Sequence, residues 1–316
     1  MARVAVLGSL NMDMVMRVPA LPRPGETVLA DRLLTVPGGK GANQAAAAAR
    51  LGARVRLIGR VGADVFGEEL ATGLEADGVD VSGVARDDVE PSGAALIMVE
   101  SGGQNLIAIA PGANGRVGDA EVGRLLYGLT AGDVVVLQLE VPLQTVLAAA
   151  AAARRADAVV ILNAAPSGHL ATHSLPEVDL LVVNETEAAD LTGEPIPGVE
   201  AAAAAAEQLG RRAPAVAVTL GAAGAILWEE GRATQIDPLP VEAVDVTAAG
   251  DAFIGAAALG MSEGWNILEA VRLGGAAGAA AVTRVGARSS LPRPGDLHRL
   301  FGIDLEQRRP GRQPSP

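Results

Sequence analysis

The sequence predicts a doubly wound α/β fold, in which helices cover both faces of a mostly parallel sheet, together with a small second sheet. Short runs rich in valine, isoleucine and leucine alternate with alanine-rich runs of helical length, and several of those runs end in glycine. Strands that are apolar throughout are typical of parallel sheets covered on both faces. Two stretches, 14–37 and 93–110, instead suggest short strands and turns without a helix, which favours a separate sheet.

The expected elements follow one another in the order that such a fold needs. Strands are expected within 3–8, 55–59, 133–140, 158–166, 179–187 and 215–228, and helices within 43–52, 65–78, 143–156, 199–210 and 251–260. We therefore expect an α/β core formed by 1–13, 38–92 and 111–305. The alternative for 14–37 and 93–110 is a pair of edge strands of the main sheet. The Pro-rich, polar tail 306–316 is expected to be disordered.

Composition narrows the class of protein. The chain has 316 residues, of which 49% are apolar, but no unbroken apolar span of the about 20 residues that a bilayer requires. We expect a soluble protein without a membrane partner, and a cytoplasmic one, because the first residues lack a signal-peptide pattern. The absence of cysteine excludes disulfides and thiolate chemistry, and a net charge of -12 argues against a nucleic-acid partner. A small-molecule ligand is the better expectation.

The motif "AAGD" combines a stripped turn with an acid. Ala248, Ala249 and Gly250 carry little or no side chain, and the helical run that follows places their N–H groups at a helix N-terminus, which attracts anions. Asp251 can take a proton from a hydroxyl held within about 3 Å. The motif therefore suits phosphoryl transfer to an alcohol. The alternative is that Asp251 only caps the helix.

Three further motifs lie where strands end or helices begin. "PGGKGANQAAAAAR" is a glycine-rich turn that leads into a helix and offers the donors Lys40, Asn43 and Gln44 to an anion or a polyhydroxylated ligand. "GSLNMDM" places Asn11 and Asp13 two residues apart on an extended segment, so both point to one side. Glu140 ends another strand in "LQLEVP". Ligands of open α/β sheets bind beyond such strand ends.

The motif "NETEAADLTG" has two interpretations. Asn184 and Glu187 have the spacing of a helix capping box, closed by a glycine nine residues after Asn184. Glu187 can alternatively hold Mg²⁺ through water molecules, as proteins often do beside a nucleotide. The sequence leaves both open.

Together these motifs resemble the ribokinase-like carbohydrate kinases, from about residue 4 to about residue 300. "GSLNMD", "PGGKGANQA", "LQLEVP", "NETE", "TLGAAG" and "DVTAAGDAF" occur in the order and approximate spacing of that family. The resemblance implies an ATP-dependent sugar kinase that uses Mg²⁺. Asp251 would be the base, with Ala248, Ala249 and Gly250 as an anion hole. The sugar would be bound by Asp251 itself together with Asn11, Asp13, Gly39, Lys40, Asn43 and Glu140. The nucleotide would be served by Asn184, Glu187, Thr219, Gly221, Gly224, Gly250 and Gly275.

The resemblance also implies a monovalent-cation site, usually for K⁺, and a β lid. Asp245, Thr247, Ala281, Gly286 and Ser290 match the cation site, several of them through backbone carbonyls. Val246 replaces the usual Thr or Ser, and Gly275 stands where the family often has His or Asn near the adenine, so base selectivity is expected to be looser. The stretches 14–37 and 93–110 would form the lid over the sugar and a homodimer interface.

Three other functions are compatible with parts of this sequence to different degrees. A related kinase would act on 2-deoxyribose, fructose or a nucleoside, although an aromatic content of 2% offers few partners for a base. A non-catalytic sugar or nucleotide sensor would be expected to lose the acid or the anion hole, and both are present. A nicotinamide-dependent dehydrogenase is disfavoured because the chain has no G-x-G-x-x-G fingerprint.

Overall fold

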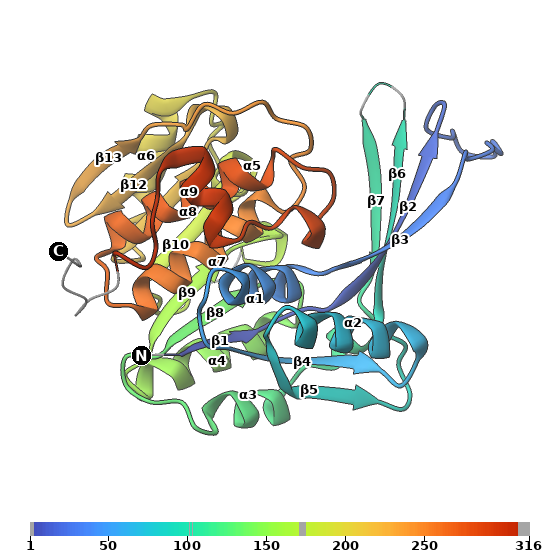
Figure 1. Ribbon diagram of the computed structural model, residues 1–316, viewed down its shortest axis with the longest axis horizontal. Helices are drawn as coiled ribbons and strands as arrows, with labels where there is room; N and C mark the ends of the chain where they lie inside the picture. The colour runs from blue at the N-terminus through green and yellow to red at the C-terminus, as the bar shows by residue number, and fades with distance from the viewer. Residues whose placement is uncertain (1–2, 101, 103, 171–174, 309–316) are drawn as a thin grey trace.

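The computed structural model describes residues 3–100, 102, 104–170 and 175–308, which form a large α/β body and a small projecting sheet (Figure 1). The main sheet has nine strands, and the predicted doubly wound arrangement is confirmed. In spatial order they are β13 (Arg232–Ile236), β12 (Ala225–Glu229), β11 (Ala215–Thr219), β10 (Leu180–Asn184), β9 (Val159–Asn163), β8 (Val134–Gln138), β1 (Val4–Leu7), β4 (Val55–Gly62) and β5 (Asp80–Asp87).

The directions of the strands indicate at which edge of the main sheet a ligand is expected to bind. All pairs from β11 to β5 are parallel, whereas β11–β12 and β12–β13 are antiparallel. The chain winds from β1 toward β5 in one direction and then, from β8, in the other. The order therefore reverses between β1 and β8, and the crevice beyond their carboxyl ends is where open α/β sheets bind ligands.

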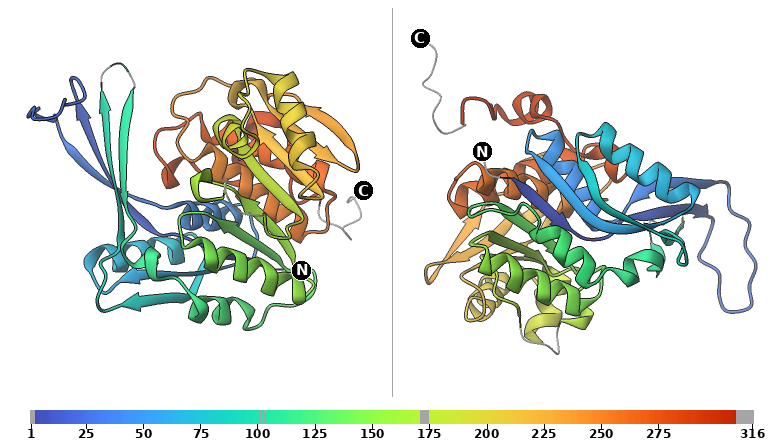
Figure 2. Two further views of the ribbon diagram at one scale, coloured as in Figure 1. Left: turned by 180° about the vertical axis from the view of Figure 1, so that it is seen from behind. Right: turned by 90° about the horizontal axis from the view of Figure 1, so that it is seen from below.

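Helices cover both faces of the sheet, as Figure 2 shows. Successive side chains of a strand point to opposite faces of the sheet, so there is one hydrophobic core on each face. In β1, Val4 and Val6 pack into the first core, while Ala5 and Leu7 pack into the second. The first core is closed by α1 (Lys40–Arg50), α2 (Val65–Ala76), α7 (Ala249–Ser262), α8 (Ile267–Ala281) and α9 (Pro294–Phe301), and the second by α3 (Asp119–Leu126), α4 (Leu143–Arg155), α5 (Glu185–Thr192) and α6 (Val199–Leu209). Short 3₁₀ turns are η1 (Gly112–Arg116), η2 (Ser167–His169), η3 (Gly221–Ala223) and η4 (Arg288–Ser290).

Helices α1 and α7 approach each other closely, and this approach brings the two glycine-rich motifs together. A Cβ on Gly255 would lie 2.7 Å from the amide nitrogen of Ala48 and 2.8 Å from the carbonyl oxygen of Gln44. Real Cβ atoms do not come so near backbone, so only glycine permits this crossing. The start of α1 consequently lies against the first turn of α7.

The small sheet projects from the body in Figures 1 and 2. Its order is β3 (Leu33–Gly38), β2 (Asn11–Val18), β6 (Gly93–Glu100) and β7 (Asn105–Ala110), with β2 and β6 parallel and the other pairs antiparallel. The alternative of edge strands in the main sheet is therefore wrong. Strand β2 begins at Asn11, so the two polar residues of "NMD" belong to this sheet.

Two further predictions from the sequence concern the C-terminal tail and membrane-spanning helices. Most of the tail, 309–316, lies outside the described residues; before it, the Arg308 guanidinium lies 5.8 Å from the centre of the Trp265 ring. Among the helices of the described part of the chain, none is long and apolar enough to cross a bilayer.

Candidate active site

The turn between β3 and α1 touches the segment that follows β1. Gly39 has φ +90°, and a Cβ there would lie 2.7 Å from the amide nitrogen of Asn11 and 3.0 Å from the carbonyl oxygen of Ser9. On Gly41 a Cβ would lie 2.6 Å from the amide nitrogen of Ser9. Only glycine fits these contacts, and they hold the start of α1 against the carboxyl end of β1.

Glu140 connects three elements at this junction. Its Oε2 accepts hydrogen bonds from the Ser9 hydroxyl at 2.6 Å, the Lys40 backbone N–H at 3.0 Å and, more weakly, Asn11 Nδ2 at 3.5 Å. Asn11 Oδ1 accepts in turn from Asn114 Nδ2 at 2.7 Å. The structure thus brings together Asn11, Lys40 and Glu140, which the sequence predicted from three separate motifs.

Asp13 lies two residues along β2 from Asn11 and beside the turn. Its Oδ2 would be 2.2 Å from a Cβ on Gly38, so glycine leaves the space that this carboxylate fills. Burial, reinforced by the negative charges of Glu140 and Asp251, raises the pKa of Asp13 to about 7, against the opposing charge of Arg288. An acid whose pKa is raised by burial among other acids is typical of a binding site.

Asp251 is the third residue of α7 and is held by α1. Its Oδ2 accepts from Asn43 Nδ2 at 3.0 Å, and its Oδ1 accepts from Gln44 Nε2 at 3.0 Å. The residue before α7 is Ala248, which provides no side-chain cap. The capping alternative is therefore wrong, because the carboxylate of Asp251 points into the protein and not back to the helix end.

The pKa of Asp251 reflects opposing influences. Burial raises it above the ordinary value, and so does the charge of Glu140; the positive charge of Lys40 and the hydrogen bonds from Asn43 and Gln44 oppose that rise. The side chain is only 7% exposed. A buried carboxylate with a raised pKa and fixed donors has the character of a general base.

The turn before α7 differs from expectation at one residue. The Ala249 N–H donates to the Val246 carbonyl at 3.3 Å, so it is not uncovered, because the turn closes on itself. Ala248 has φ +59°, a left-handed conformation that is uncommon outside glycine. A Cβ on Gly250 would meet no atom within 4 Å. The space over Gly250 is therefore open, as a close ligand approach requires.

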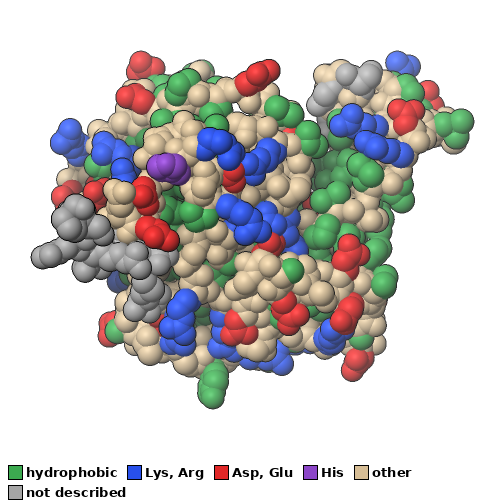
Figure 3. Space-filling model, viewed as in Figure 1, with side chains coloured by type: hydrophobic (Ala, Val, Ile, Leu, Met, Phe, Trp, Pro, Cys, Tyr) green, Lys and Arg blue, Asp and Glu red, His purple; other side chains and the backbone are tan. Residues whose placement is uncertain are grey.

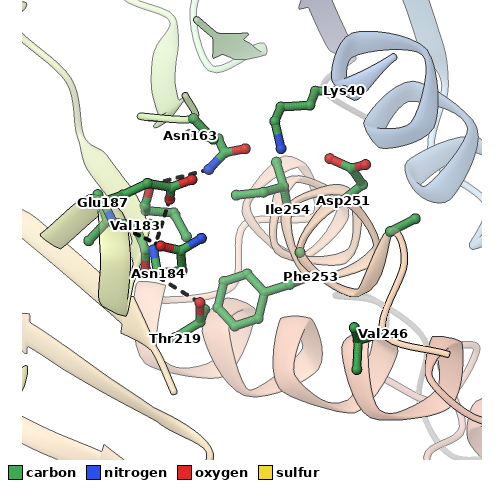
Figure 4. Close-up of a pocket in the computed structure, with 14 residues that line it drawn as sticks. Lys40, Asn163, Val183, Asn184, Glu187, Thr219, Val246, Asp251, Phe253 and Ile254 are labelled. Atoms are coloured by element: carbon green, nitrogen blue, oxygen red, sulfur yellow. Dashed lines mark hydrogen bonds between the residues drawn. The ribbon is translucent and has the colours of Figure 1, made fainter. Parts of the chain in front are cut away.

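A cavity of about 220 Å³ opens above this turn. Lys40 reaches into it between Asn163 and Asp251 in the view of Figure 4. Burial would lower the pKa of Lys40, but the negative charges of Asp251, Glu140 and Glu187 raise it overall. The cavity is lined by Lys40, Asn163, Ala165, Val182, Val183, Asn184, Glu187, Thr219, Val246, Ala248, Gly250, Asp251, Phe253 and Ile254. The cavity thus combines apolar side chains with a group of polar ones, and it has Lys40 as a cation beside the candidate base.

Asn184 and Glu187 form the capping box and line the cavity as well. Asn184 Oδ1 accepts from the Glu187 N–H, and Glu187 Oε2 accepts from the Asn184 N–H, both at 2.9 Å. Burial raises the pKa of Glu187, with Asp190 and Asp251 adding to the rise and the Asn184 N–H and Lys40 opposing it. The capping interpretation is confirmed, and it leaves a second carboxylate oxygen beside the cavity.

The other residues expected near the nucleotide are less directly placed. Thr219 lines the cavity and donates through Oγ1 to the Val183 carbonyl at 3.4 Å, whereas Gly221, Gly224 and Gly275 are not among the lining residues. Gly224 has a structural reason to be glycine, because its φ is +88° and a Cβ would lie 2.1 Å from the Ile236 carbonyl oxygen.

Four of the five residues expected at the cation site lie on two loops that are bonded together. Asp245 Oδ1 accepts from the Thr247 hydroxyl at 2.6 Å and N–H at 2.9 Å, and Asp245 Oδ2 accepts from the Gly286 N–H at 2.8 Å. Burial would raise the pKa of Asp245, but these hydrogen bonds and the charge of Arg17 hold it below the ordinary value. Ser290 is fully buried, and its hydroxyl donates to the Ala287 carbonyl at 2.9 Å. Ala281 ends α8, just before this second loop. In the described part of the chain, no group of three His, Cys, Asp or Glu side chains forms a metal cluster.

Two polar residues near Asp251, Gln138 and Asn163, were not predicted, whereas Gln44 was expected as a donor of the glycine-rich motif. Gln44, Gln138 and Asn163 form a buried chain of amides that reaches Asp251. The sequence signal of Gln138 and Asn163 is a single polar residue at the carboxyl end of an apolar strand, as in "VVVLQ" and "VVILN". The same signal marks Asn184 and Thr219, at the ends of the next two strands.

Comparison with known proteins identifies the family. The model of the pfkB family carbohydrate kinases matches residues 1–294. The chain belongs to that family. It is 38% identical over 290 residues to ribokinase of Haemophilus influenzae, covering 92% of this chain and 95% of the relative. It is 34% identical over 291 residues to deoxyribokinase of Salmonella typhi, with the same coverage of both chains. The structure of Arabidopsis thaliana ribokinase complexed with ribose and ATP is 33% identical, with a TM-score of 0.84, and the match covers 96% of this chain and 100% of that one. This pfkB-family chain is therefore a sugar phosphotransferase.

Proposed function

We propose that this kinase transfers the γ-phosphoryl group of ATP to the 5-hydroxyl of D-ribose, giving D-ribose 5-phosphate and ADP. The observation that carries the proposal is the position of Asp251 at the start of α7, held by two amides of α1 and beside the cavity that Lys40 enters. The similarity to ribokinases over nine-tenths of the chain supports ribose as the acceptor. 2-Deoxyribose is the second candidate, supported by the similarity to a deoxyribokinase.

The proton of the acceptor hydroxyl is assigned to Asp251. As the hydroxyl oxygen forms its bond to the γ-phosphorus, the bond from that phosphorus to the β,γ-bridging oxygen breaks, and ADP leaves with the electron pair. The carboxylate of Asp251 takes the proton of the hydroxyl. Burial raises the pKa of Asp251, so its carboxylate has a greater proton affinity than that of an ordinary aspartate, as suits a general base.

The charge of the migrating phosphoryl group needs fixed donors. The first N–H groups of α7 have no partner within the helix, and the open space at Gly250 lets phosphate oxygens approach them. With the Ala249 N–H partly engaged, we assign the largest share of the anion hole to the N–H of Gly250 and the smaller shares to those of Ala248 and Ala249. Lys40 adds a positive charge at the same end of the cavity.

Mg²⁺ would neutralise the phosphates of the bound nucleotide, and Glu187 and Asn184 are suited to hold it through water molecules. The fit is supported by the environment of Glu187, because burial, with the charges of Asp190 and Asp251 adding to it, raises the pKa of this carboxyl, and a cation beside it would favour the ionised form. Thr219 ends the next strand, Gly221 and Gly224 follow it, and all three would face the nucleotide. Gly275 on α8 would lie near its base and offers no side chain to it.

The sugar would be bound on the other side of Asp251. Asn11, Asp13 and Glu140 present amide and carboxylate groups at the junction of the two sheets, where ribose hydroxyls need both donors and acceptors. Asn43 donates to Asp251 and leaves its buried Oδ1 without a hydrogen-bond partner. A hydroxyl of the sugar would supply that partner, and Gly39 and Lys40 would complete the wall of the site.

K⁺ would fix the two loops that precede and flank α7. The carboxylate of Asp245, whose pKa is held below the ordinary value, and backbone carbonyls between Ala281 and Ser290 would form a donor set that suits a monovalent cation. Thr247 and Gly286 contact Asp245 directly. Their role in catalysis would be to hold the turn at Ala248 in its left-handed conformation.

The lid would also form the interface of a homodimer. Large apolar side chains are exposed on the projecting sheet, as Figure 3 shows, and they include Leu33, Leu96, Leu106, Ile107 and Ile109. An exposed apolar surface of this kind is typical of an interaction site. A second copy of the lid offers a matching apolar surface.

The direct test is ADP release with ATP, Mg²⁺ and K⁺, with ribose, 2-deoxyribose, fructose and adenosine compared at equal concentration. We expect the highest kcat/KM with ribose. A preference for 2-deoxyribose would keep the mechanism and replace the acceptor. No turnover with any of the four, in a protein that still binds ribose, would favour a sensor.

A further inference from the structure

Asp251 is the end of a buried chain of side-chain amides. Gln138 Nε2 donates to Gln44 Oε1 at 2.7 Å, and Gln44 Nε2 donates both to Asp251 Oδ1 at 3.0 Å and to Asn163 Oδ1 at 3.1 Å. We infer that Gln44 is a positioning residue for the candidate base and that Gln138 fixes the orientation of the Gln44 amide. This inference rests on the proposed function of Asp251.

The chemistry of Asp251 determines which way the amides point. An ionised carboxylate only accepts hydrogen bonds, so Gln44 must present its NH₂ group to Asp251. The Oε1 of Gln44 then faces Gln138 and needs a donor, which the NH₂ group of Gln138 supplies. If Gln44 were turned over, its oxygen would face the carboxylate and its NH₂ group would face another NH₂ group. The hydrogen bonds with Gln138, Asp251 and Asn163, three in all, would be lost together.

Packing leaves these side chains no freedom to rearrange. Gln44 is 1% exposed and Gln138 is fully buried, so water does not compete for their bonds. Gln138 Oε1 has no hydrogen-bond partner, and it lies where a Cβ on Gly8 would be only 1.8 Å away. A buried acceptor without a partner is costly. Gln138 thus has an unpartnered oxygen, while its NH₂ group donates to Gln44. This is consistent with a functional role for the orientation of the Gln138 amide, beyond packing.

Gln44 and Gln138 are absent from the lining of the cavity, whereas Asp251 is part of it. Substitutions at the two glutamines therefore act on the base without removing a group from the cavity wall. The charged groups around Asp251 are Lys40 on α1, Glu140 after β8, Asp13 on β2 and Glu187 on α5, and none of them is altered by these substitutions. A hydrogen bond to the ionised form of an acid lowers its pKa, so the loss of Gln44 Nε2 raises it.

The test compares Gln44→Met, Gln138→Met and the double variant with the native kinase. Methionine has nearly the same shape as glutamine and cannot donate. For Gln44→Met we expect the acidic limb of the pH profile of kcat to move to higher pH. At pH values on the acidic side of that limb, kcat should fall by roughly tenfold to 10²-fold, while the KM for ribose should stay within about twofold of the native value. Gln138→Met should shift the limb in the same direction by less.

The double variant distinguishes a relay from two independent effects. Because Gln138 acts through Gln44, adding Gln138→Met to Gln44→Met should not move the limb further. An unmoved limb in Gln44→Met overturns the positioning role, and an equal shift from Gln138→Met in both backgrounds overturns the relay. Purely structural roles would lower the melting temperature and leave the limb in place.

A readout without turnover separates this inference from the proposed function. The ¹³C carboxyl resonance of Asp251, assigned by its loss in Asp251→Asn, reports the protonation of this residue directly. A higher titration midpoint in Gln44→Met supports the inference even if the native protein turns over none of the sugars tested. An unchanged midpoint in a folded Gln44→Met variant contradicts it, and if that variant does not fold, the midpoint in Gln138→Met decides.

Discussion

Asn43 Nδ2 donates to Asp251 Oδ2 at 3.0 Å, although 208 positions separate the two residues in the chain. The first lies in the first turn of α1 and the second in the first turn of α7, so the two helix N-termini meet at one carboxylate. The close crossing at Gly255 makes this meeting possible. The candidate base is consequently held by the same helix whose glycine-rich start forms part of the candidate sugar site.

Replacement of the base gives the first prediction. Asp251→Asn keeps the shape of the side chain but removes its proton affinity, so we expect turnover to fall by about 10² to 10⁴-fold. Ribose binding, measured by calorimetry, should remain largely intact, since the sugar is held by other groups. The exposed Asp88→Asn serves as the matched control and should turn over like the native protein. Near-native turnover of Asp251→Asn would remove this residue from the role of base.

The cation loops give the second prediction. Replacing K⁺ by Na⁺ should lower kcat several-fold in the native protein. Asp245→Asn keeps an acceptor for Thr247 but loses the charge, so its turnover should be low in both salts and nearly independent of the cation. Initial rates at constant ionic strength measure both effects. If native turnover is equal in the two salts, these loops do not form a cation site.

The sequence predicts the main sheet well because its strands are apolar throughout. The expected helices within 65–78, 143–156 and 199–210 agree with α2, α4 and α6 to within two residues at each end. Helix α9 was not expected, since "PGDLHRLF" is short and begins with Pro and Gly, and its form depends on packing of Leu297 in the first core. The small sheet was expected, but its first strand begins at Asn11 and not at residue 14.

The sequence predicted those residues of the candidate site whose type and motif indicate a chemical role. It missed residues whose role depends on a contact with another part of the chain. Asp251, Lys40 and Glu140 stand next to glycines or at strand ends, so their motifs are visible in the sequence. Gln138 and Asn163 each follow four apolar residues of their strands, and only the pairing of β8 with β9 brings them side by side. The engagement of the Ala249 N–H depends on the exact closure of a turn, which no pattern of residue types records.

The lid gives the third prediction. Pairing of β2, β6 and β7 places Ile107 on the face that carries Asp13 and Leu106 on the opposite face. If the proposed dimer forms through one face of the lid, either Ile107→Lys or Leu106→Lys, but not both equally, should convert dimer to monomer in sedimentation velocity. Val89→Lys is the matched control, because Val89 is also an exposed apolar residue but lies outside the lid. A monomeric native protein, or dimers in all three variants, would contradict the proposal.

The raised pKa of Asp13 gives the fourth prediction, on stability. The folded protein has a pKa of about 7 at Asp13, against the ordinary value of 3.8 that applies in the unfolded chain. Between these values the folded state holds a proton that the unfolded state has released, so the stabilising contribution of protonated Asp13 is complete below 3.8 and is lost as the pH rises through about 7. The side chain in Asp13→Asn stays neutral. The melting temperature of this variant minus that of the native protein should therefore increase from about pH 4 to about pH 8. Each ~1 kcal/mol corresponds to about 2 °C for a chain of this size, which differential scanning fluorimetry resolves. Asp88→Asn should show no such trend, and an unchanging difference between Asp13→Asn and the native protein across this range would show that Asp13 titrates normally in the folded state.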